Sequence, residues 1–290
     1  MAGNSNTITR DYLDSLLIET RYMDSTNPDT TFELYGETFA SPIMTAALSH
    51  LDHAMPGASV ALAQGAKAAG AVLWYGMAPD EEIEALTATG ARLIEIIKPY
   101  ADREKLRARI RHAEKLGLLA VGIDIDHPFA NDGSPDIVDG EEMKALTTPE
   151  LAELCRETKL PLIAKGVLSL RDAGRCLDAG VGGMVLSHHN NRIEYAVPPL
   201  MLLPEIRAIS GAIPLFVDGE IRTGMDAFKA LALGAKGVCI GRPLMAAIRQ
   251  GGAEAVREYL EGTNKELAKA MACTGCTTLS RMDPTVIHRV

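Results

Sequence analysis

RDAGRCLDAGVGGMVLS, residues 171–187, and MDAFKALALGAKGVCIG, residues 225–241, are two versions of one pattern. The shared positions lie 54 residues apart in every case: Asp172, Ala173, Gly180 and Gly183 recur as Asp226, Ala227, Gly234 and Gly237. A period of that length holds two strand–helix units, which favours a barrel that grew by duplication. The chain has no GxGxxG after its first predicted strand, so an open nucleotide-binding Rossmann sheet has little support.

Each of these two segments contains a short apolar run, and six more such runs lie before and between them. Each of the eight has four to seven core residues bounded by Gly, Pro or charge, which is typical of strands buried on both faces. The runs are SPIMTAAL (41–48), AVLWYGM (71–77), RLIEIIK (92–98), AVGIDID (120–126), PLIAKGV (161–167), GGMVLSHH (182–189), PLFVDGEI (214–221) and GVCIGRP (237–243). Amphipathic stretches such as residues 102–116 lie between them, and Thr148-Pro149 reads as an N-cap followed by Pro at the first helical position. The chain is therefore predicted to be an α/β protein, a single (β/α)8 TIM barrel over residues 41–290.

Two segments do not belong to this alternation of strands and helices. Residues 1–40 form an N-terminal extension that either plugs the bottom of the barrel or contacts a neighbouring subunit. Residues 127–145, rich in Gly, Pro and Asp, follow the fourth strand. A connection of this length is either a lid over a site or a loose surface insertion.

Composition narrows the functional classes. Of 290 residues, 47% are hydrophobic and 23% charged, as in ordinary globular proteins. The net charge of −9 disfavours nucleic acid and anionic membranes as partners. Five cysteines without framework spacing favour a reducing, cytoplasmic location. We expect no secretory signal, no membrane span and no metal site.

Barrel enzymes carry their sites at the carboxyl ends of the strands. The polar residues at these ends are Ser49, His50, Tyr75, Glu95, Lys98, Asp124, Asp126, Lys165, residues 187–192, residues 218–222, Gly241 and Arg242. The loops after the last two strands, DGEIR and GRP, predict a phosphate site in which Arg222 and Arg242 bind the anion through bidentate bonds. Lys165 at a buried strand end predicts an anionic ligand or a charge that develops during reaction.

SHHNNR, residues 187–192, follows the sixth run directly. His189 can take a proton near neutral pH, and Arg192 can hold a carboxylate through its planar fork. This pair suits a substrate whose carboxylate is next to the carbon that loses its proton. His188 is the more structural of the two histidines.

Residues 162–192 and 214–243 resemble the FMN-dependent α-hydroxy-acid dehydrogenases and oxidases, the family of glycolate oxidase, lactate oxidase and flavocytochrome b2. MACTGCTTL, residues 271–279, is similar to the closing helix of that family, and the likeness covers roughly residues 40–280. The resemblance implies an FMN-binding barrel that oxidises a lactate- or glycolate-like 2-hydroxy acid, or a larger analogue, to the 2-keto acid, with transfer of the α-hydrogen to flavin N5. It also implies a homo-oligomer, a tetramer or larger.

The resemblance also assigns roles to residues. His189 matches the catalytic base, Arg192 the arginine that binds the substrate carboxylate, and Lys165 the lysine that stabilises the anionic reduced flavin. The residues expected to bind FMN are Lys165, Ser187, Asp218, Gly219, Arg222, Gly241, Arg242, Glu95 and Asp124. The electron acceptor, oxygen or a carrier, is left open.

Several positions depart from the family. Glu95 stands where the family has an amide and Ile97 about where it has a tyrosine. Asp124 replaces a threonine, Glu220 replaces a glycine, and Asn190-Asn191 replace small residues. A second substrate arginine is missing. Losing one transition-state donor costs about 2–4 kcal/mol. Lys98 or Tyr100 could act as donors instead, and a negative Asp124 near the flavin would oppose its reduction.

Two other functions therefore stay open at this point. One is a flavin-binding barrel with an altered substrate or little catalysis, in a sensor or assembly role. The other is an isomerase or aldolase of a phosphorylated ligand, with Lys165 as the Schiff-base lysine.

Overall fold

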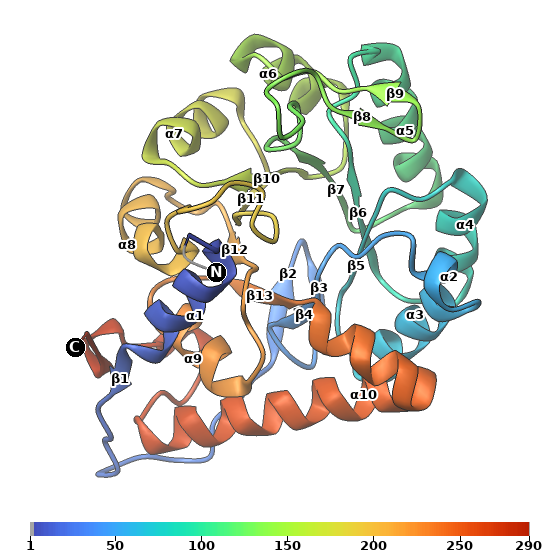
Figure 1. Ribbon diagram of the computed structural model, residues 1–290. Helices are drawn as coiled ribbons and strands as arrows, with labels where there is room; N and C mark the ends of the chain where they lie inside the picture. The colour runs from blue at the N-terminus through green and yellow to red at the C-terminus, as the bar shows by residue number, and fades with distance from the viewer. Residues whose placement is uncertain (1–2, 290) are drawn as a thin grey trace.

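The fold is a ring of eight parallel strands with helices outside it, as the computed structural model of the chain, described for residues 3–289, shows (Figure 1). The ring runs in the order β4 (Ile43–Thr45), β13 (Gly237–Ile240), β12 (Leu215–Val217), β11 (Gly183–Leu186), β10 (Leu162–Val167), β7 (Ala120–Asp124), β6 (Leu93–Ile97) and β5 (Leu73–Gly76). It closes between β4 and β5, where the Gly76 N–H donates to the Leu48 carbonyl at 2.9 Å. All eight predicted strands are confirmed, and so is the TIM barrel.

Helices follow the strands and cover the outside of the ring (Figure 1). They are α2 (Leu51–Ala54), α3 (Ala58–Ala68), α4 (Asp80–Ala88), α5 (Arg103–Leu116), α6 (Thr148–Glu157), α7 (Leu170–Ala179), α8 (Pro199–Ile209), α9 (Gly224–Ala232) and α10 (Arg242–Cys273). The N-cap of α6 is Thr147, not Thr148 as the sequence predicted. Only Thr147 has a glutamate three residues on, so it forms a reciprocal capping box with Glu150. Among the described helices, we find none that is long and apolar enough to span a membrane.

The side chains of the strands alternate between two apolar layers, as the two-residue period of a strand requires. Along β6, Ile94 and Ile96 point into the barrel, whereas Leu93 and Ile97 pack between the sheet and the helices. The interior layer is filled by one large side chain from most strands, among them Met44, Trp74, Ile163, Val185 and Phe216. Side chains at the strand ends that continue this inward alternation therefore meet at the carboxyl end of the barrel.

The N-terminal segment covers both ends of the barrel. A hairpin of β2 (Phe32–Leu34) and β3 (Glu37–Phe39) closes the bottom: Phe32 joins the interior core, and the Tyr35 hydroxyl donates to the Gly182 carbonyl at 2.9 Å. A plug at the bottom was one of the two roles that the sequence left open for this segment. Helix α1 (Ser5–Asp14) instead lies against the carboxyl-end loops, and β1 (Leu16–Ile18) pairs with β14 (Ile287–Arg289) near the C-terminus (Figure 1).

Residues 127–145 are ordered by their own hairpin of β8 (Ile137–Val138) and β9 (Glu141–Glu142). The hairpin is tied to the loop after β6, where the Ala101 N–H donates to the Glu142 carbonyl at 2.8 Å and the Lys144 N–H to the Pro99 carbonyl at 2.9 Å. These bonds hold the segment at the carboxyl end of the barrel, so it is not a loose insertion.

Candidate functional site

A cavity of about 520 Å³ opens at the carboxyl ends of the strands. Its size is that of a pocket for a small molecule or cofactor. Its walls combine apolar groups from the loop after β4 with polar groups from the ends and loops of the later strands. They include seven of the residues predicted from the sequence: Lys165, His189, Asp218, Gly219, Arg222, Gly241 and Arg242.

Three charged side chains form a buried cluster beside the cavity, the Lys98–Asp124–Lys165 cluster. The Lys98 Nζ donates to Asp124 Oδ2 at 2.7 Å, and the Lys165 Nζ donates to Asp124 Oδ1 at 2.8 Å. Burial alone would favour the neutral acid, but Lys165 together with His189 and Lys98 lowers the pKa of Asp124 well below its usual range. The cluster therefore carries two positive charges and one negative charge.

Asp124, Asp126 and His189 present ligand atoms within 4.8 Å of one another, a spacing that a metal ion could bridge. The two ammonium groups already take both oxygens of Asp124 and supply its positive counter-charge. The arrangement is thus an ion-pair cluster in its own right.

Glu95 is not part of this site, contrary to its predicted role in binding the cofactor. It has the same parity on β6 as Leu93 and Ile97, so it points outward and pairs with Arg109 of α5. Burial raises the pKa of Glu95, and Arg109 opposes that shift. The interior residue at this strand end is Lys98, so Ile97 does not occupy a substrate-facing position either.

His189 is held by a carboxylate that the sequence analysis placed at the strand ends without a role. The His189 Nδ1 lies 3.0 Å from Asp126 Oδ1. Asp126 reaches this position because Gly166 has no side chain: a Cβ at Gly166, where φ is +94°, would lie 2.1 Å from the Asp126 carboxyl carbon. A proton on Nδ1 is bonded to Asp126, which leaves Nε2 free to accept a proton from a ligand.

The turn that carries His189 has an unusual backbone. His189, Asn190 and Asn191 have φ of 48°, 55° and 68°, all in the left-handed region that asparagine tolerates better than most residues. Both asparagines also bind α1: the Asn6 Nδ2 donates to Asn190 Oδ1 at 3.0 Å, and the Ser5 N–H donates to Asn191 Oδ1 at 2.6 Å. The two asparagines therefore supply both the turn and its anchor.

Two further residues of this stretch support the turn. The Ser187 hydroxyl oxygen accepts the His189 N–H at 2.9 Å, and His188 Nδ1 accepts the Asn191 N–H at 3.2 Å. Burial lowers the pKa of His188, which favours the neutral ring. Both side chains are buried behind the loop. Their contacts are structural, and neither Ser187 nor His188 is among the residues that line the cavity.

Arg192 is bonded to the segment after the fourth barrel strand. It donates to Asp136 Oδ2 at 2.7 Å and to the Phe129 carbonyl. The same Asp136 oxygen lies 2.8 Å from His127 Nδ1. Burial, together with the positive charges of Lys98, His189 and Arg192, lowers the pKa of His127 to about 4. Asp136 thus occupies the place at which a substrate carboxylate is expected to meet Arg192.

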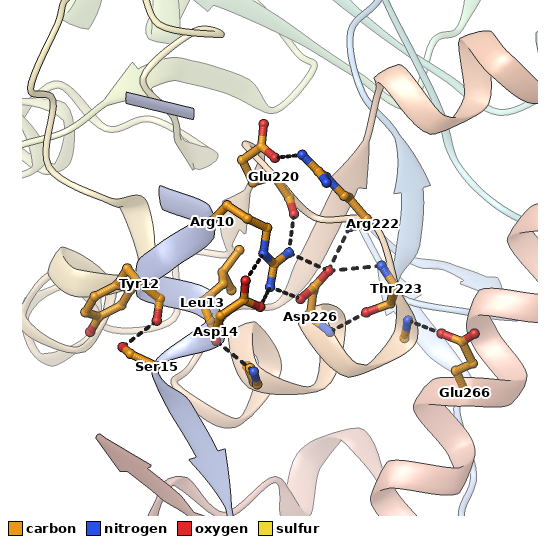
Figure 2. Close-up of polar contacts among 12 residues, drawn as sticks. Arg10, Tyr12, Leu13, Asp14, Ser15, Glu220, Arg222, Thr223, Asp226 and Glu266 are labelled. Carbon is orange, nitrogen blue, oxygen red and sulfur yellow. Dashed lines mark hydrogen bonds and ion pairs between the residues drawn. The ribbon is translucent and has the colours of Figure 1, made fainter. Parts of the chain in front are cut away.

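The two loops of the predicted phosphate site meet on the other side of the cavity. Gly219, with φ +98°, turns the backbone after Asp218, whose carboxylate lies 4.0 Å from the Lys165 Nζ. Arg222 and Arg242 converge on the carboxylate of Glu220 (the Glu220–Arg222 pair is shown in Figure 2). The site therefore brings the two predicted arginines together, around an internal carboxylate.

Helix α1 fixes this loop from outside. The Arg10 guanidinium donates to the Glu220 carbonyl at 3.1 Å and to both oxygens of Asp226, at 2.8 and 3.1 Å (Figure 2). Asp226 also forms a capping box with Thr223 and accepts the Arg222 N–H at 3.0 Å. Sequence patterns did not reveal this contact, because Arg10 and Asp226 are 216 positions apart.

Comparison with known proteins places this geometry among flavin enzymes. The model of the FMN-dependent dehydrogenase family matches residues 2–144 and 131–289. Glycolate oxidase of Spinacia oleracea is 30% identical, over 97% of this chain and 85% of that protein. The 4-hydroxymandelate oxidase of Amycolatopsis orientalis is 29% identical, over 96% and 90%. A crystal structure of mandelate oxidase, 28% identical, superposes with a TM-score of 0.88 over 100% of this chain and 91% of that one.

Proposed function

The chain belongs to the FMN-dependent dehydrogenase family, and from this premise we propose that it oxidises a 2-hydroxy acid to the 2-keto acid. It is an oxidoreductase with FMN as its cofactor. The observation that carries the proposal is the placement of His189, held by Asp126, in the wall of a cavity that Lys165 also lines. Arg192 follows three residues later in the same loop, outside the cavity wall, where it is paired with Asp136.

The cavity has most of the groups that a flavin mononucleotide needs. Lys165 supplies a cation in the wall, Asp218 an acceptor for the ribityl hydroxyls, and Gly219 and Gly241 room for the backbone to approach. Arg222 and Arg242 supply the phosphate corner. When bound, FMN accepts the hydride that leaves the α-carbon.

The Lys98–Asp124–Lys165 cluster answers the question of how a negative Asp124 is compatible with flavin reduction. With two ammonium groups and one carboxylate, the cluster has the net charge of a lone lysine. It therefore stabilises the negative charge that the cofactor gains, as Lys165 alone would. Lys98 compensates for the carboxylate at position 124.

His189 and Asp126 perform the proton chemistry. With Nδ1 bonded to Asp126, the His189 Nε2 takes the proton of the substrate hydroxyl as the α-hydrogen leaves. The imidazolium that forms is stabilised by Asp126 at 3.0 Å and by Asp124 at 3.7 Å. This dyad speaks against a flavin protein without turnover.

Arg192 binds the substrate carboxylate, and the segment 127–145 acts as a lid, one of the two roles that the sequence left open for it. Its Asp136 neutralises Arg192 until substrate arrives, and the substrate carboxylate then takes over the guanidinium. The support for this exchange is the position of Asp136 on the hairpin segment, next to both Arg192 and His127.

The aldolase or isomerase alternative is disfavoured by the state of Lys165. Burial favours its neutral amine, but Asp124, Asp218 and Asp126 raise its pKa well above the usual range. A lysine that stays protonated cannot attack a carbonyl carbon, so Lys165 is unsuited to a Schiff base.

Anaerobic absorption spectroscopy tests the proposal. The flavin bands of the wild type should bleach with at least one member of a panel of L- and D-2-hydroxy acids, and His189→Gln should bleach at least about 10²-fold more slowly. His288→Gln, an exposed histidine on β14, is the matched control and should behave as the wild type. A flavin-loaded wild type that bleaches with no 2-hydroxy acid would refute the assignment.

We also propose that the chain forms a homo-oligomer, a tetramer or larger, in the cytoplasm. All five cysteines are free, which suits a reducing compartment. Light scattering of the holoprotein measures the oligomeric state, and the rate of flavin reoxidation with and without oxygen identifies the class of electron acceptor.

A further inference from the structure

Glu220 stands at the centre of the corner that the cofactor phosphate should enter. Its side chain is only 1% exposed, whereas those of its partners Arg222 and Arg242 are each 52% exposed. Both arginines pair with its carboxylate, and Glu220 lines the cavity together with them (the Arg222 pair is shown in Figure 2). An anion that enters this corner therefore meets two guanidinium groups that already share a buried negative charge.

The backbone at Glu220 shows that this carboxylate is held at a cost. Its φ is +60°, in the left-handed region that disfavours residues with a side chain and favours glycine. Glycine is the residue that the FMN-dependent dehydrogenase family has at this position. The Glu220 Oε1 is buried, and Arg242 pairs with it. A strained backbone is tolerated when the residue has a role in the site.

The carboxylate cannot easily leave the corner. The Arg10 guanidinium binds the Glu220 carbonyl, and Asp226 binds the Arg222 N–H, so both ends of the short loop are fixed (Figure 2). The two arginine side chains are half exposed and can rotate. A phosphate must therefore take the guanidinium groups away from Glu220 and remain near its charge.

We propose that Glu220 competes with the 5′-phosphate of FMN for Arg222 and Arg242, and so sets how strongly this protein distinguishes FMN from riboflavin. The phosphate contact then adds little to affinity, and the flavin is held mainly through its ring and ribityl chain. The proposal rests on FMN as the cofactor and is independent of the substrate that is oxidised.

Binding titrations of the apoprotein, followed by flavin fluorescence, test the proposal. FMN and riboflavin are each titrated into the wild type, Glu220→Gln and Glu220→Gly, and the quantity compared is the ratio of the two Kd values. Glu220→Gln keeps the size and removes the charge, whereas Glu220→Gly also suits the backbone at φ +60°. Glu254→Gln, at an exposed glutamate of α10 that pairs with Arg257, is the control for net charge.

We expect both Glu220 variants to increase the preference for FMN at least tenfold, which corresponds to about 1.4 kcal/mol, with Glu254→Gln unchanged. Riboflavin affinity should stay within about twofold, which also shows that the variants are folded. A preference that is unchanged or falls in both variants would overturn the proposal, because Glu220 would then only brace the arginines. A gain in Glu220→Gly alone would overturn it as well, since relief of strain and not of charge would be the cause.

Because the readout is binding, its result is separate from that of the activity test. A wild type that binds flavin but oxidises no 2-hydroxy acid leaves the role of Glu220 fully testable. Glu220 variants that gain FMN affinity relative to the wild type support the competition whatever the substrate is.

Discussion

Replacing Lys98 by methionine removes one of the two ammonium groups that hold Asp124, and its effect depends on what else is in the cluster. At the observed Nζ–Oδ2 distance of 2.7 Å, the attraction between the two charges is ~6 kcal/mol for an effective dielectric constant of about 20. Desolvation of both groups offsets part of this, and breaking a buried pair from one side costs about 3–5 kcal/mol. Asp124 keeps Lys165 at 2.8 Å, so we expect Lys98→Met to lower the free energy of unfolding by about 3 kcal/mol.

The sign of the effect should change when Asp124 is absent. In an Asp124→Thr background, Lys98 and Lys165 face each other without the carboxylate that both bind. Removing Lys98 there takes away an uncompensated buried charge, so the same substitution should be neutral or stabilising. The double-mutant cycle then gives a coupling free energy of at least about 3 kcal/mol, at the upper end of those measured for neighbouring residues.

Equilibrium urea unfolding of the four apoproteins measures this cycle, and the comparison holds when the curves share one slope. Lys105→Met is the matched control: it breaks an exposed pair with Glu141 and should cost less than about 1 kcal/mol. If Lys98→Met lowers stability equally in the wild-type and the Asp124→Thr backgrounds, the two residues are not coupled and our account of the cluster is wrong.

Three further outcomes follow from the contacts of the site. Asp126→Asn should lower kcat by roughly 10²–10⁴-fold, because an amide does not stabilise the imidazolium of His189; an unchanged kcat in stopped-flow reduction would contradict this. Asp136→Asn removes the internal competitor for Arg192 and should lower KM for the hydroxy acid several-fold, whereas a higher KM would show that Asp136 positions the arginine. The folded-state pKa of His127 is lowered to about 4, below its value of about 6.5 in the unfolded chain, so its contribution to stability is complete above about pH 6.5 and is lost as the pH falls towards 4. His127→Gln should therefore flatten the loss of stability over this range in urea titrations at several pH values, and an unchanged slope would exclude this histidine as its source.

The barrel was predictable from the sequence because its strands are bounded by Gly, Pro or charge and are apolar on both faces. Every predicted run contains a strand, from β4 to β13. The sequence patterns did not reveal segments that are stabilised by residues far away along the chain. The sequence of helix α1 does not belong to a repeated strand–helix unit. The helix docks through hydrogen bonds from Arg10 to Asp226 and from Ser5 to Asn191. Neither contact leaves a local signal in the sequence.

The error at Glu95 was avoidable on physical grounds. Glu95 and Lys98 stand three positions apart on one strand, so their side chains cannot both point into the barrel. Asp124 and Asp126 stand two positions apart, and both belong to the interior set. Applying the two-residue period from Ile94 and Ile96 selects Lys98 and rejects Glu95. The same rule places Asp126 on the inner side with Asp124, but its contact with His189 is evident only in the structure.

The cations of the site are paired with carboxylates of the chain itself. Lys98 and Lys165 share Asp124, Arg192 has Asp136, and the two arginines of the phosphate corner share Glu220. A buried cation without a partner is costly, so such pairing stabilises the protein before any ligand arrives. An anionic ligand then gains only the difference between its own contacts and those of the carboxylate that it displaces. Affinity for anions should accordingly rise when an exchangeable carboxylate, at Asp136 or Glu220, is neutralised. Asp124 is not exchangeable in this way, because its two oxygens are bonded to Lys98 and Lys165 and it is not among the residues that line the cavity.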